Sequence, residues 1–314
     1  MAIELEVVDT LCIWNKSPHN AFTDLIRYND YFYCAFREAS SHMSLDGSIR
    51  VLKSEDGLRW TSVLVLSWQG GDLRDPKLSI TPSNQLLITV GIRLAVPSKI
   101  IEKLMSVSWI YANEEITGPY LCDTGYGTWR WGPAWHKNYV YSIGYAGKDF
   151  FGCLYRSNDG KKWSVHKSPF FPASDFFSNE SSLVFSDKDI SYCLLRRDGL
   201  NATALLGQSQ SPYQEWQWTD LGLEIGGPKM IFLSDGTLVA AFRVIDEDRE
   251  NAKTVLYQIE LNGKLIFLCE LLSGGDTSYA GMVELDGYLW ISYYSSHEDQ
   301  SAIYFAKVKI HHSS

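Results

Sequence analysis

The segment from Cys34 to Trp60, CAFREASSHMSLDGSIRVLKSEDGLRW, contains the pattern that decides the fold. An apolar strand-like run ends at Arg37, a second run follows, and a Ser-x-Asp-Gly-x-x-Trp turn, Ser54 to Trp60, leads into a third. An Asp-Gly turn between alternating runs is typical of a β-hairpin. Because parts of this pattern recur along the chain, it predicts a repeat protein built from strands.

Six segments share one layout: a short strand, a tight turn with Asn or Asp, and a strongly apolar second strand. The second strands end at Arg37, Arg93, Tyr145, Arg196, Arg243 and Tyr294. These ends are spaced by roughly fifty residues, the period of a four-stranded propeller blade. The sixth repeat has only three strands, and the run IELEVVDT at residues 3–10 can supply its fourth.

Closing the ring in this way would remove exposed sheet edges. We therefore expect an all-β, six-bladed β-propeller in which the N-terminal strand completes the last blade. The prediction is one domain over residues 1–314, with residues 94–128 as a loop elaboration of the second blade.

Composition and charge argue against some classes of partner for this protein. The formal net charge of −9 argues against a nucleic-acid partner, which needs broad basic surfaces. The longest apolar runs have the length of strands, so no membrane insertion is expected. The first residues show no signal-peptide pattern, and the six cysteines are scattered without metal-ligand spacing. We expect free thiols, a cytoplasmic location, and no metal or cofactor.

Arginine ends four of the six second strands, at Arg37, Arg93, Arg196 and Arg243. In a common register these guanidinium groups would converge on one pocket and repel one another. A carboxylate, sulfate or phosphate ligand would offset that repulsion through bidentate hydrogen bonds. The alternative is that each arginine pairs with a nearby acid. Arg197, next to Arg196, should point the opposite way.

The first strands add polar groups where they begin, so these side chains should rim the pocket. They are Asn20, Asp24, Arg74, Asp75, Glu180, Asp276 and Tyr279. Trp129, Trp131 and Trp135 offer an apolar wall against a sugar ring, or else pack between blades.

The turn Ser54–Trp60 recurs at Ser157–Trp163 and, in a decayed form, at Ser209–Trp216. These turns resemble the Asp-box of the sialidase (neuraminidase) superfamily, in a form one residue shorter. The whole chain looks like a member of that superfamily, close to bacterial exo-α-sialidase-like proteins. In such a box the Ser and Asp side chains bind turn amides and the Trp packs between blades, away from the pocket.

The resemblance implies hydrolysis of a terminal, acidic sugar held by arginines, with a tyrosine nucleophile in place of a second carboxylate. Tyr279 matches the tyrosine, and Glu180 matches the glutamate that takes the phenolic proton. Arg196 matches one arginine of the family's triad, and Arg243 is a candidate for another.

The remaining assignments depart from the family. Asp46 lies in the loop that carries the family's acid/base, but it precedes Gly47, which favours a turn residue over a catalytic one. His42, in the same loop, is a substitute because imidazole titrates near neutral pH. The first inner strand, HNAFTDLI, lacks the family's Tyr-Arg-Ile-Pro-like motif, so Arg37 or Arg93 would have to replace its arginine.

Two other hypotheses stay open. A propeller glycosidase could use Asp75 and Glu180 as a carboxylate pair, separated by about 5–5.5 Å for retention or about 6.5–9.5 Å for inversion. Alternatively, the propeller binds a carbohydrate without catalysis. Fold alone does not choose between these functions.

Overall fold

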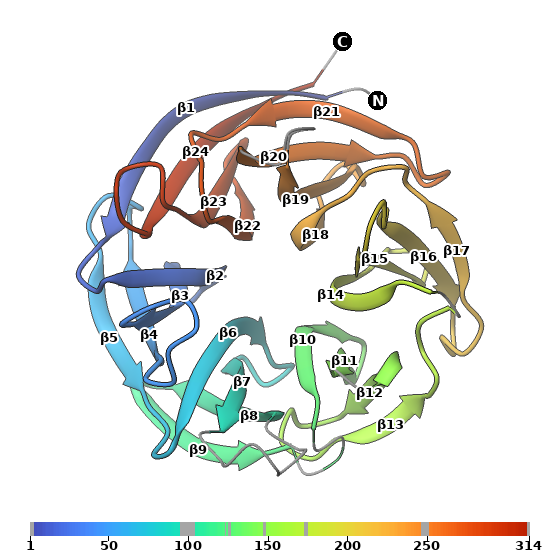
Figure 1. Cartoon of the computed structure of the whole chain (residues 1–314), viewed down its shortest axis with the longest axis horizontal. Helices are drawn as coiled ribbons and strands as arrows, with labels where there is room; N and C mark the ends of the chain where they lie inside the picture. The colour runs from blue at the N-terminus through green and yellow to red at the C-terminus, as the bar shows by residue number, and fades with distance from the viewer. Residues whose placement is uncertain are drawn as a thin grey trace.

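The computed structural model describes residues 3–94, 104–122, 124, 127–146, 149–172, 175–245 and 251–312. Six four-stranded antiparallel sheets surround a central channel as the blades of a propeller (Figure 1). This confirms the predicted fold class. No helix among the described residues is long and apolar enough to cross a membrane.

Blades 1 to 5 each use four consecutive strands, numbered outward from the channel. Blade 1 contains β2 (His19–Tyr28), β3 (Tyr31–Ala39), β4 (Ser48–Ser54) and β5 (Thr61–Leu66). Blade 2 contains β6 (Gly71–Ile80), β7 (Leu86–Leu94), β8 (Leu104–Ala112) and β9 (Glu115–Leu121). Blade 3 contains β10 (Trp129–His136), β11 (Tyr139–Ala146), β12 (Asp149–Ser157) and β13 (Ser164–Lys167).

The other three blades follow the same plan around the ring. Blade 4 contains β14 (Phe177–Phe185), β15 (Ile190–Asp198), β16 (Leu205–Gln210) and β17 (Gln217–Asp220). Blade 5 contains β18 (Gly226–Phe232), β19 (Leu238–Ile245), β20 (Ala252–Ile259) and β21 (Leu265–Glu270). Blade 6 contains β22 (Thr277–Leu285), β23 (Tyr288–Ser295), β24 (Ala302–His312) and β1 (Ile3–Trp14).

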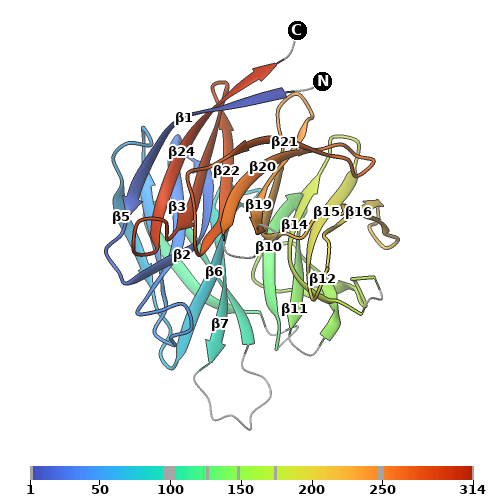
Figure 2. The ribbon, with the colours of Figure 1, turned by 45° about the horizontal axis from the view of Figure 1, so that its top comes forward.

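The N-terminal strand β1 is the outermost strand of blade 6, as predicted. It runs antiparallel to β24 from the pair Ile3–His312 to the pair Trp14–Ile303. Figure 2 shows the two strands side by side, with both chain termini at the same edge. This pairing joins the two ends of the chain and closes the ring.

The prediction of a loop elaboration at residues 94–128 is wrong for its central part. Residues 104–121 form β8 and β9, the two outer strands of blade 2. Asn113 and Glu114 both have positive φ and make a two-residue hairpin between Ala112 and Glu115. This turn lacks glycine, and β9 is almost wholly exposed. The sequence from this turn through β9 therefore lacks both the glycine-containing turn and the buried apolar run that usually indicate a strand. Residues 95–103 lie outside the described residues.

The Asp-box-like turns make the hydrogen bonds expected of them. The Asp56 carboxylate accepts the amides of Leu58 and Arg59, and the Ser54 hydroxyl accepts the amide of Gly57. The Trp60 indole donates to the carbonyl of Gly57. Ser157–Trp163 repeats these contacts, and both turns join the third and fourth strands of a blade, away from the channel. They therefore act in folding.

Each inner strand carries a β-bulge at an equivalent place in its pairing with the second strand. The bulges lie between Ala21/Asp24, Arg74/Lys77, Trp131/Ala134, Ser178/Ser181, Gly226/Lys229 and Ser278/Gly281. In five blades the first bulged residue has positive φ, namely Phe22, Asp75, Gly132, Gly227 and Tyr279. A bulge bends its strand and re-aims the adjacent side chains, so the six bulges determine what faces the channel.

The hydrophobic core lies between neighbouring blades. Between blades 1 and 2, for example, Ala35 and Val51 pack in one cluster with Leu73 and Val90, all fully buried. The cysteines Cys34 and Cys193 are also fully buried, and they form no disulfide. Burial of apolar side chains between neighbouring blades thus stabilises the ring.

A Gly281→Ala substitution is expected to destabilise the contact between the first and last blades. A Cβ at Gly281 would lie 2.0 Å from the backbone nitrogen of Leu25 in β2, and backbone yields less easily than a side chain. We expect a loss of about 3 kcal/mol or more in the free energy of unfolding, measured by urea denaturation. The control is Gly274→Ala, whose nearest contact is 3.3 Å away. Equal stability of the two variants would contradict the packing described here.

Candidate active site

A cavity of about 320 Å³ opens at the end of the channel where the inner strands begin. It is lined by Phe22, His42, Met43, Arg74, Asp75, Arg93, Leu104, Trp129, Tyr145, Asn179, Glu180 and Tyr279. These residues come from blades 1, 2, 3, 4 and 6, as expected if the starts of the inner strands rim one pocket. A larger cavity of about 840 Å³ lies beside Phe232 and Leu261 and contains none of the residues predicted for the site.

Two residues that line the cavity, Tyr279 and Glu180, form a chain of contacts that continues to Arg196. The Tyr279 hydroxyl donates a hydrogen bond to Oε1 of Glu180. The other oxygen of Glu180 accepts Nη1 of Arg196 at 2.6 Å and the amide of Gly227 at 3.3 Å. Both Tyr279 and Glu180 are buried. A phenol and a carboxylate in direct contact have the geometry needed for proton transfer.

The bulge of β22 places the Tyr279 side chain in this position. Tyr279 has a φ of 52° and Ser278 a φ of 103°, a strained backbone that persists only where the surrounding packing enforces it. The ring packs against Phe22 with centroids 5.0 Å apart and against Trp131 at 5.8 Å. Gly227 makes room, because a Cβ there would lie 2.8 Å from the Tyr279 ring. Residues of four blades therefore fix one phenol.

Electrostatics separate the protonation states of this pair. Burial, and then the charge of Glu180, raise the pKa of Tyr279 well above its ordinary value. Burial also acts to raise the pKa of Glu180, but Arg196 and the Tyr279 hydrogen bond outweigh it, so that pKa is lowered. At neutral pH the tyrosine is consequently neutral and the glutamate ionised.

Asp75 is the second buried carboxyl group that lines the cavity. It is the first bulged residue of β6, with a φ of 52°. Burial raises the pKa of Asp75 to about 6, against the opposing charges of Arg74 and Lys77. A carboxyl group with a pKa close to neutral can both donate and accept a proton near neutral pH.

The four arginines do not share a register. Arg37 and Arg243 face Ala21 and Gly226, the residues just before their bulges. In blade 4 the residue that faces the position before the bulge is Arg197, so Arg196 is offset by one residue. In blade 2 it is Gly91, which puts Arg93 two residues away. The expectation of a common register is therefore wrong, because it counted residues from the turns and not from the bulges.

Arg37, predicted to bind substrate, lies outside the cavity. Its side chain is fully buried, and its Nε donates to Asp72, also fully buried, at 2.7 Å. Its Nη1 and Nη2 atoms donate to the carbonyls of Ser41 and Ser44. The pairing with an acid, which the sequence left open as the alternative, applies to this arginine.

The other predicted arginines lie at or beside the cavity. Arg93 lines it and forms no ion pair among the described residues. Arg243 approaches Asp276 at 3.6 Å, and Arg196 also binds Asp198 at 2.8 Å. Arg74, predicted from the sequence only as a rim group, lines the cavity too. Arg197 points away, as expected, and binds Asp220 of β17. Several cations thus remain near the phenol.

Two further predictions fail on geometry. The Asp46 carboxylate accepts the amide of Ser40, and hydrogen bonds from Ser44 and Ser40 lower its pKa to about 2, so it is a turn residue with no proton to give near neutral pH. Trp131 does not line the cavity, because its ring lies behind Tyr279 with Lys77 Nζ 4.8 Å from its centroid. Trp129 lines the cavity instead.

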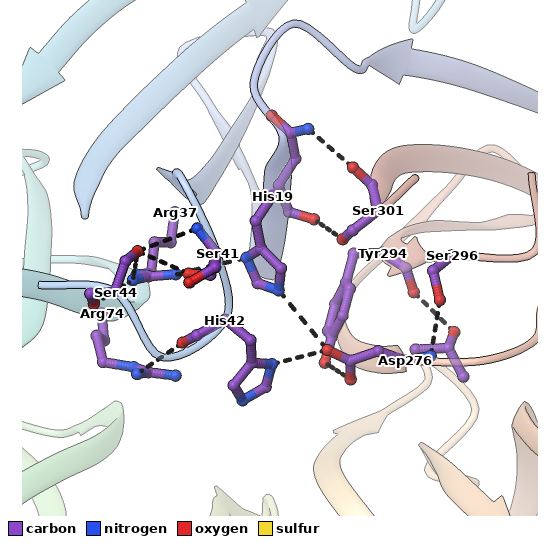
Figure 3. A network of polar contacts seen from close by, with 12 residues as sticks. His19, Arg37, Ser41, His42, Ser44, Arg74, Asp276, Tyr294, Ser296 and Ser301 are labelled. Carbon is purple, nitrogen blue, oxygen red and sulfur yellow. Dashed lines mark hydrogen bonds and ion pairs between the residues drawn. The ribbon is translucent and has the colours of Figure 1, made fainter. Parts of the chain in front are cut away.

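His42 and Asp276 meet at the edge of the cavity, where Figure 3 shows them with His19. The His42 Nδ1 lies 2.8 Å from Oδ2 of Asp276, and Tyr294 donates to Oδ1 of the same carboxylate at 2.6 Å. Sequence reasoning missed His19 and Tyr294. The sequence showed Tyr294 only as the end of the sixth second strand, the place that Arg37 occupies in the first, and the structure gives both residues the same register relative to their bulges.

Comparisons with known proteins agree with this architecture. No protein-family model matches the chain, and no curated protein matches it. Among solved structures, a protein of unknown function from Dyadobacter fermentans superposes with a TM-score of 0.86 at 18% identity, covering 98% of this chain and 100% of that one. The chain has the fold of a sialidase propeller.

Two sialidases support that statement. Trypanosoma rangeli sialidase with the inhibitor DANA gives a TM-score of 0.70 at 13% identity, over 96% of this chain and 58% of that one. A mutant of NanB sialidase from Streptococcus pneumoniae gives 0.72 at 9% identity, over 95% of this chain and 70% of that one. At such identities the likeness concerns the fold, and the chain spans little more than half of the Trypanosoma protein.

An Arg37→Ala substitution is expected to act on stability and not on ligand affinity. It leaves the Asp72 carboxylate buried without its closest partner, a change that typically costs about 3–5 kcal/mol. Urea denaturation measures the loss, and the double variant Arg37→Ala/Asp72→Ala should recover part of it. A variant with normal stability but a raised KM would instead assign Arg37 to ligand binding.

Proposed function

We propose that the protein is an exo-glycoside hydrolase of the sialidase type, acting on a terminal, acidic sugar. The observation that carries the proposal is the contact between the Tyr279 hydroxyl and the Glu180 carboxylate at the cavity. A phenol held against a buried carboxylate is the arrangement that a tyrosine nucleophile requires. The sialidase fold of the solved neighbours is consistent with it.

In the first step the Tyr279 oxygen attacks the anomeric carbon while its proton passes to Glu180. The glycosidic bond breaks, and the leaving oxygen needs a proton. Asp75 is the proposed donor, because it lines the same cavity and its pKa is raised to about 6. Water then attacks the glycosyl–tyrosine, giving its proton to the Asp75 carboxylate, and Glu180 returns the first proton to Tyr279.

The acidic-sugar preference follows from the charges at the cavity. Arg74 and Arg93 line it, and Arg196 touches Glu180. A neutral phenol also suits an anomeric centre bearing a carboxylate, since an anionic nucleophile would be repelled by that charge. Guanidinium groups bind a carboxylate with two parallel hydrogen bonds. The proposed ligand is therefore a sugar carboxylate held by these arginines.

Tyr279→Phe and Glu180→Gln test the proposed nucleophile and its base. On a panel of fluorogenic glycosides that includes sialosides, we expect Glu180→Gln to lower kcat about 10²–10⁴-fold, since a general base is lost. Tyr279→Phe should lower kcat roughly 10³-fold or more. Tyr192→Phe is the control, a buried tyrosine of blade 4 outside the cavity, and should retain activity.

Two results would contradict the proposal. Unchanged activity in both variants would remove the tyrosine mechanism and leave the Asp75/Glu180 carboxylate pair as the catalytic alternative. Sugar binding by the wild-type protein without hydrolysis of any glycoside would indicate a carbohydrate-binding propeller.

The role of Asp75 predicts a pH dependence. If the protonated form donates to the leaving group, kcat falls as pH rises through about 6. Asp75→Asn should abolish that fall and slow glycosides of poor leaving groups more than those of activated aryl groups. Leaving-group series measured at several pH values provide the check, and an unchanged pH profile in Asp75→Asn would assign the proton donor elsewhere.

Asp75 should also lower the thermal stability of the protein at pH values above about 6, an effect that can be measured without any substrate. Its folded-state pKa lies above the usual value near 3.8, so the fold favours the protonated form. Stability contributed by this group is present at low pH and lost as pH rises to about 6. Asp75→Asn is thus expected to raise Tm above pH 6, measured by thermal denaturation; a lowered Tm would contradict the buried, unfavourable charge.

A further inference from the structure

A cluster of three metal-binding side chains lies beside the proposed catalytic pair. His19 comes from the start of β2, His42 from the loop after β3, and Asp276 from the residue before β22. One potential ligand atom of each lies within 4.8 Å of the others. Figure 3 shows both imidazole rings directed at the same carboxylate. We propose that His19, His42 and Asp276 bind one divalent transition-metal ion of the zinc class.

The distances fit a shared ion. The His42 Nδ1 is 2.8 Å and the His19 Nε2 is 3.7 Å from Oδ2 of Asp276. Ligand atoms about 2.0–2.2 Å from a tetrahedral zinc lie about 3.3 Å from one another, midway between these values. The three ligand atoms lie within 4.8 Å of one another, so the two imidazole rings would turn closer together on binding the ion.

His19 supplies an independent reason to expect a ligand. Its side chain is buried, and its Nε2 has no hydrogen-bond partner among the described residues, since 3.7 Å is too long for one. A buried polar atom without a partner is costly. Coordination of an ion would satisfy this nitrogen at the point to which it is directed.

The carboxylate is held from behind, as metal-binding carboxylates commonly are. Tyr294 donates to Oδ1 of Asp276 at 2.6 Å, and the Asp276 amide donates to the Ser296 hydroxyl. These contacts leave Oδ2 for the two histidines. Outer hydrogen bonds of this kind orient the ligands of a metal.

Three arginines lie near the cluster, and two of them, Arg37 and Arg74, share the Asp72 carboxylate at 2.7 Å and 3.5 Å. Arg37 Nη1 lies 3.4 Å from Nδ1 of His19, on the far side of the ring from Nε2, but Asp72 neutralises it at 2.7 Å. Arg243 is 3.6 Å from Oδ1 of Asp276, and Arg74 donates to the backbone carbonyl of His42. Imidazole nitrogen with one carboxylate oxygen favours zinc, copper, nickel or iron over calcium and magnesium.

An ion can reach the cluster from the cavity. The His42 side chain is 45% exposed, and the residue lines the cavity. Three protein ligands leave a fourth position for water or a ligand oxygen, as in catalytic zinc sites. The bound ion would add positive charge at the edge of the cavity. Its binding does not depend on the proposed hydrolysis.

Titration of metal-free protein with Zn²⁺ by calorimetry tests the inference. We expect the wild type to bind one ion per chain. His42→Ala and Asp276→Asn should each lower the affinity for Zn²⁺ at least about 100-fold, because loss of a hydrogen-bonding partner of a ligand already lowers metal affinity by up to about 100-fold. Co²⁺ in the same site should give the strong visible absorption of tetrahedral cobalt, abolished by His42→Ala. Because His42 is in an exposed loop, this variant should fold; thermal denaturation checks that it does.

The control is His311→Ala, which removes an exposed histidine 2.9 Å from Glu6 in a simple two-residue pair. It should bind Zn²⁺ as the wild type does. No binding by the wild type, or equal affinities of the wild type and His42→Ala, would overturn the inference. The cluster would then be a hydrogen-bonded His–Asp–His group only. Normal hydrolysis without zinc binding would overturn this site and leave the proposed function intact.

Discussion

The bulge in each inner strand is the constraint on which the site depends. It adds one residue to the innermost strand of every blade, at an equivalent place in the pairing with the second strand. Asp75 and Tyr279 occupy the first bulged position in two blades and have positive φ there. The same position is Gly132 or Gly227 in two other blades and Phe22, also with positive φ, in a third. Without the bulges, a regular strand would direct these side chains between blades.

The same geometry has an energetic consequence. Tyr279 and Asp75 both have left-handed backbone, and Asp75 is a buried carboxyl group whose ionisation the fold opposes. Each strained backbone conformation opposes folding by about 1–3 kcal/mol. They persist because the closed ring of six blades and the clusters between blades stabilise the chain around them. Destabilising features that gather at one cavity are typical of functional sites.

The ring was predictable because its signals are local and repeated. Each blade carries a turn and an apolar strand at a regular spacing, and β1 alternates as an edge strand should. The proximity of Tyr279 and Glu180 was also anticipated, through the resemblance of their motifs to a known family. What that resemblance implies about their chemistry remains a proposal.

The register was not predictable, since a single inserted residue changes which side chains face the cavity. Counting from the turns aligned Arg93 and Arg196 with the wrong residues. Arg37 has the register of Arg243, but its side chain pairs with Asp72 outside the cavity. The bulge signal is present as the dipeptides Asp75-Pro76, Gly132-Pro133 and Gly227-Pro228, because proline tolerates a bulge that lacks a strand hydrogen bond. The His19, His42 and Asp276 cluster joins segments as far apart as residues 19 and 276, and only the folded ring brings them together.

The most direct test of the central claim is to trap the covalent intermediate. Incubation with 2,3-difluorosialic acid, followed by proteolysis and mass spectrometry, identifies the residue that carries the sugar. The account predicts one glycosyl adduct on the peptide containing Tyr279, absent in Tyr279→Phe. An adduct on Asp75 or Glu180, or hydrolysis of a sialoside with no adduct on any residue, would contradict it.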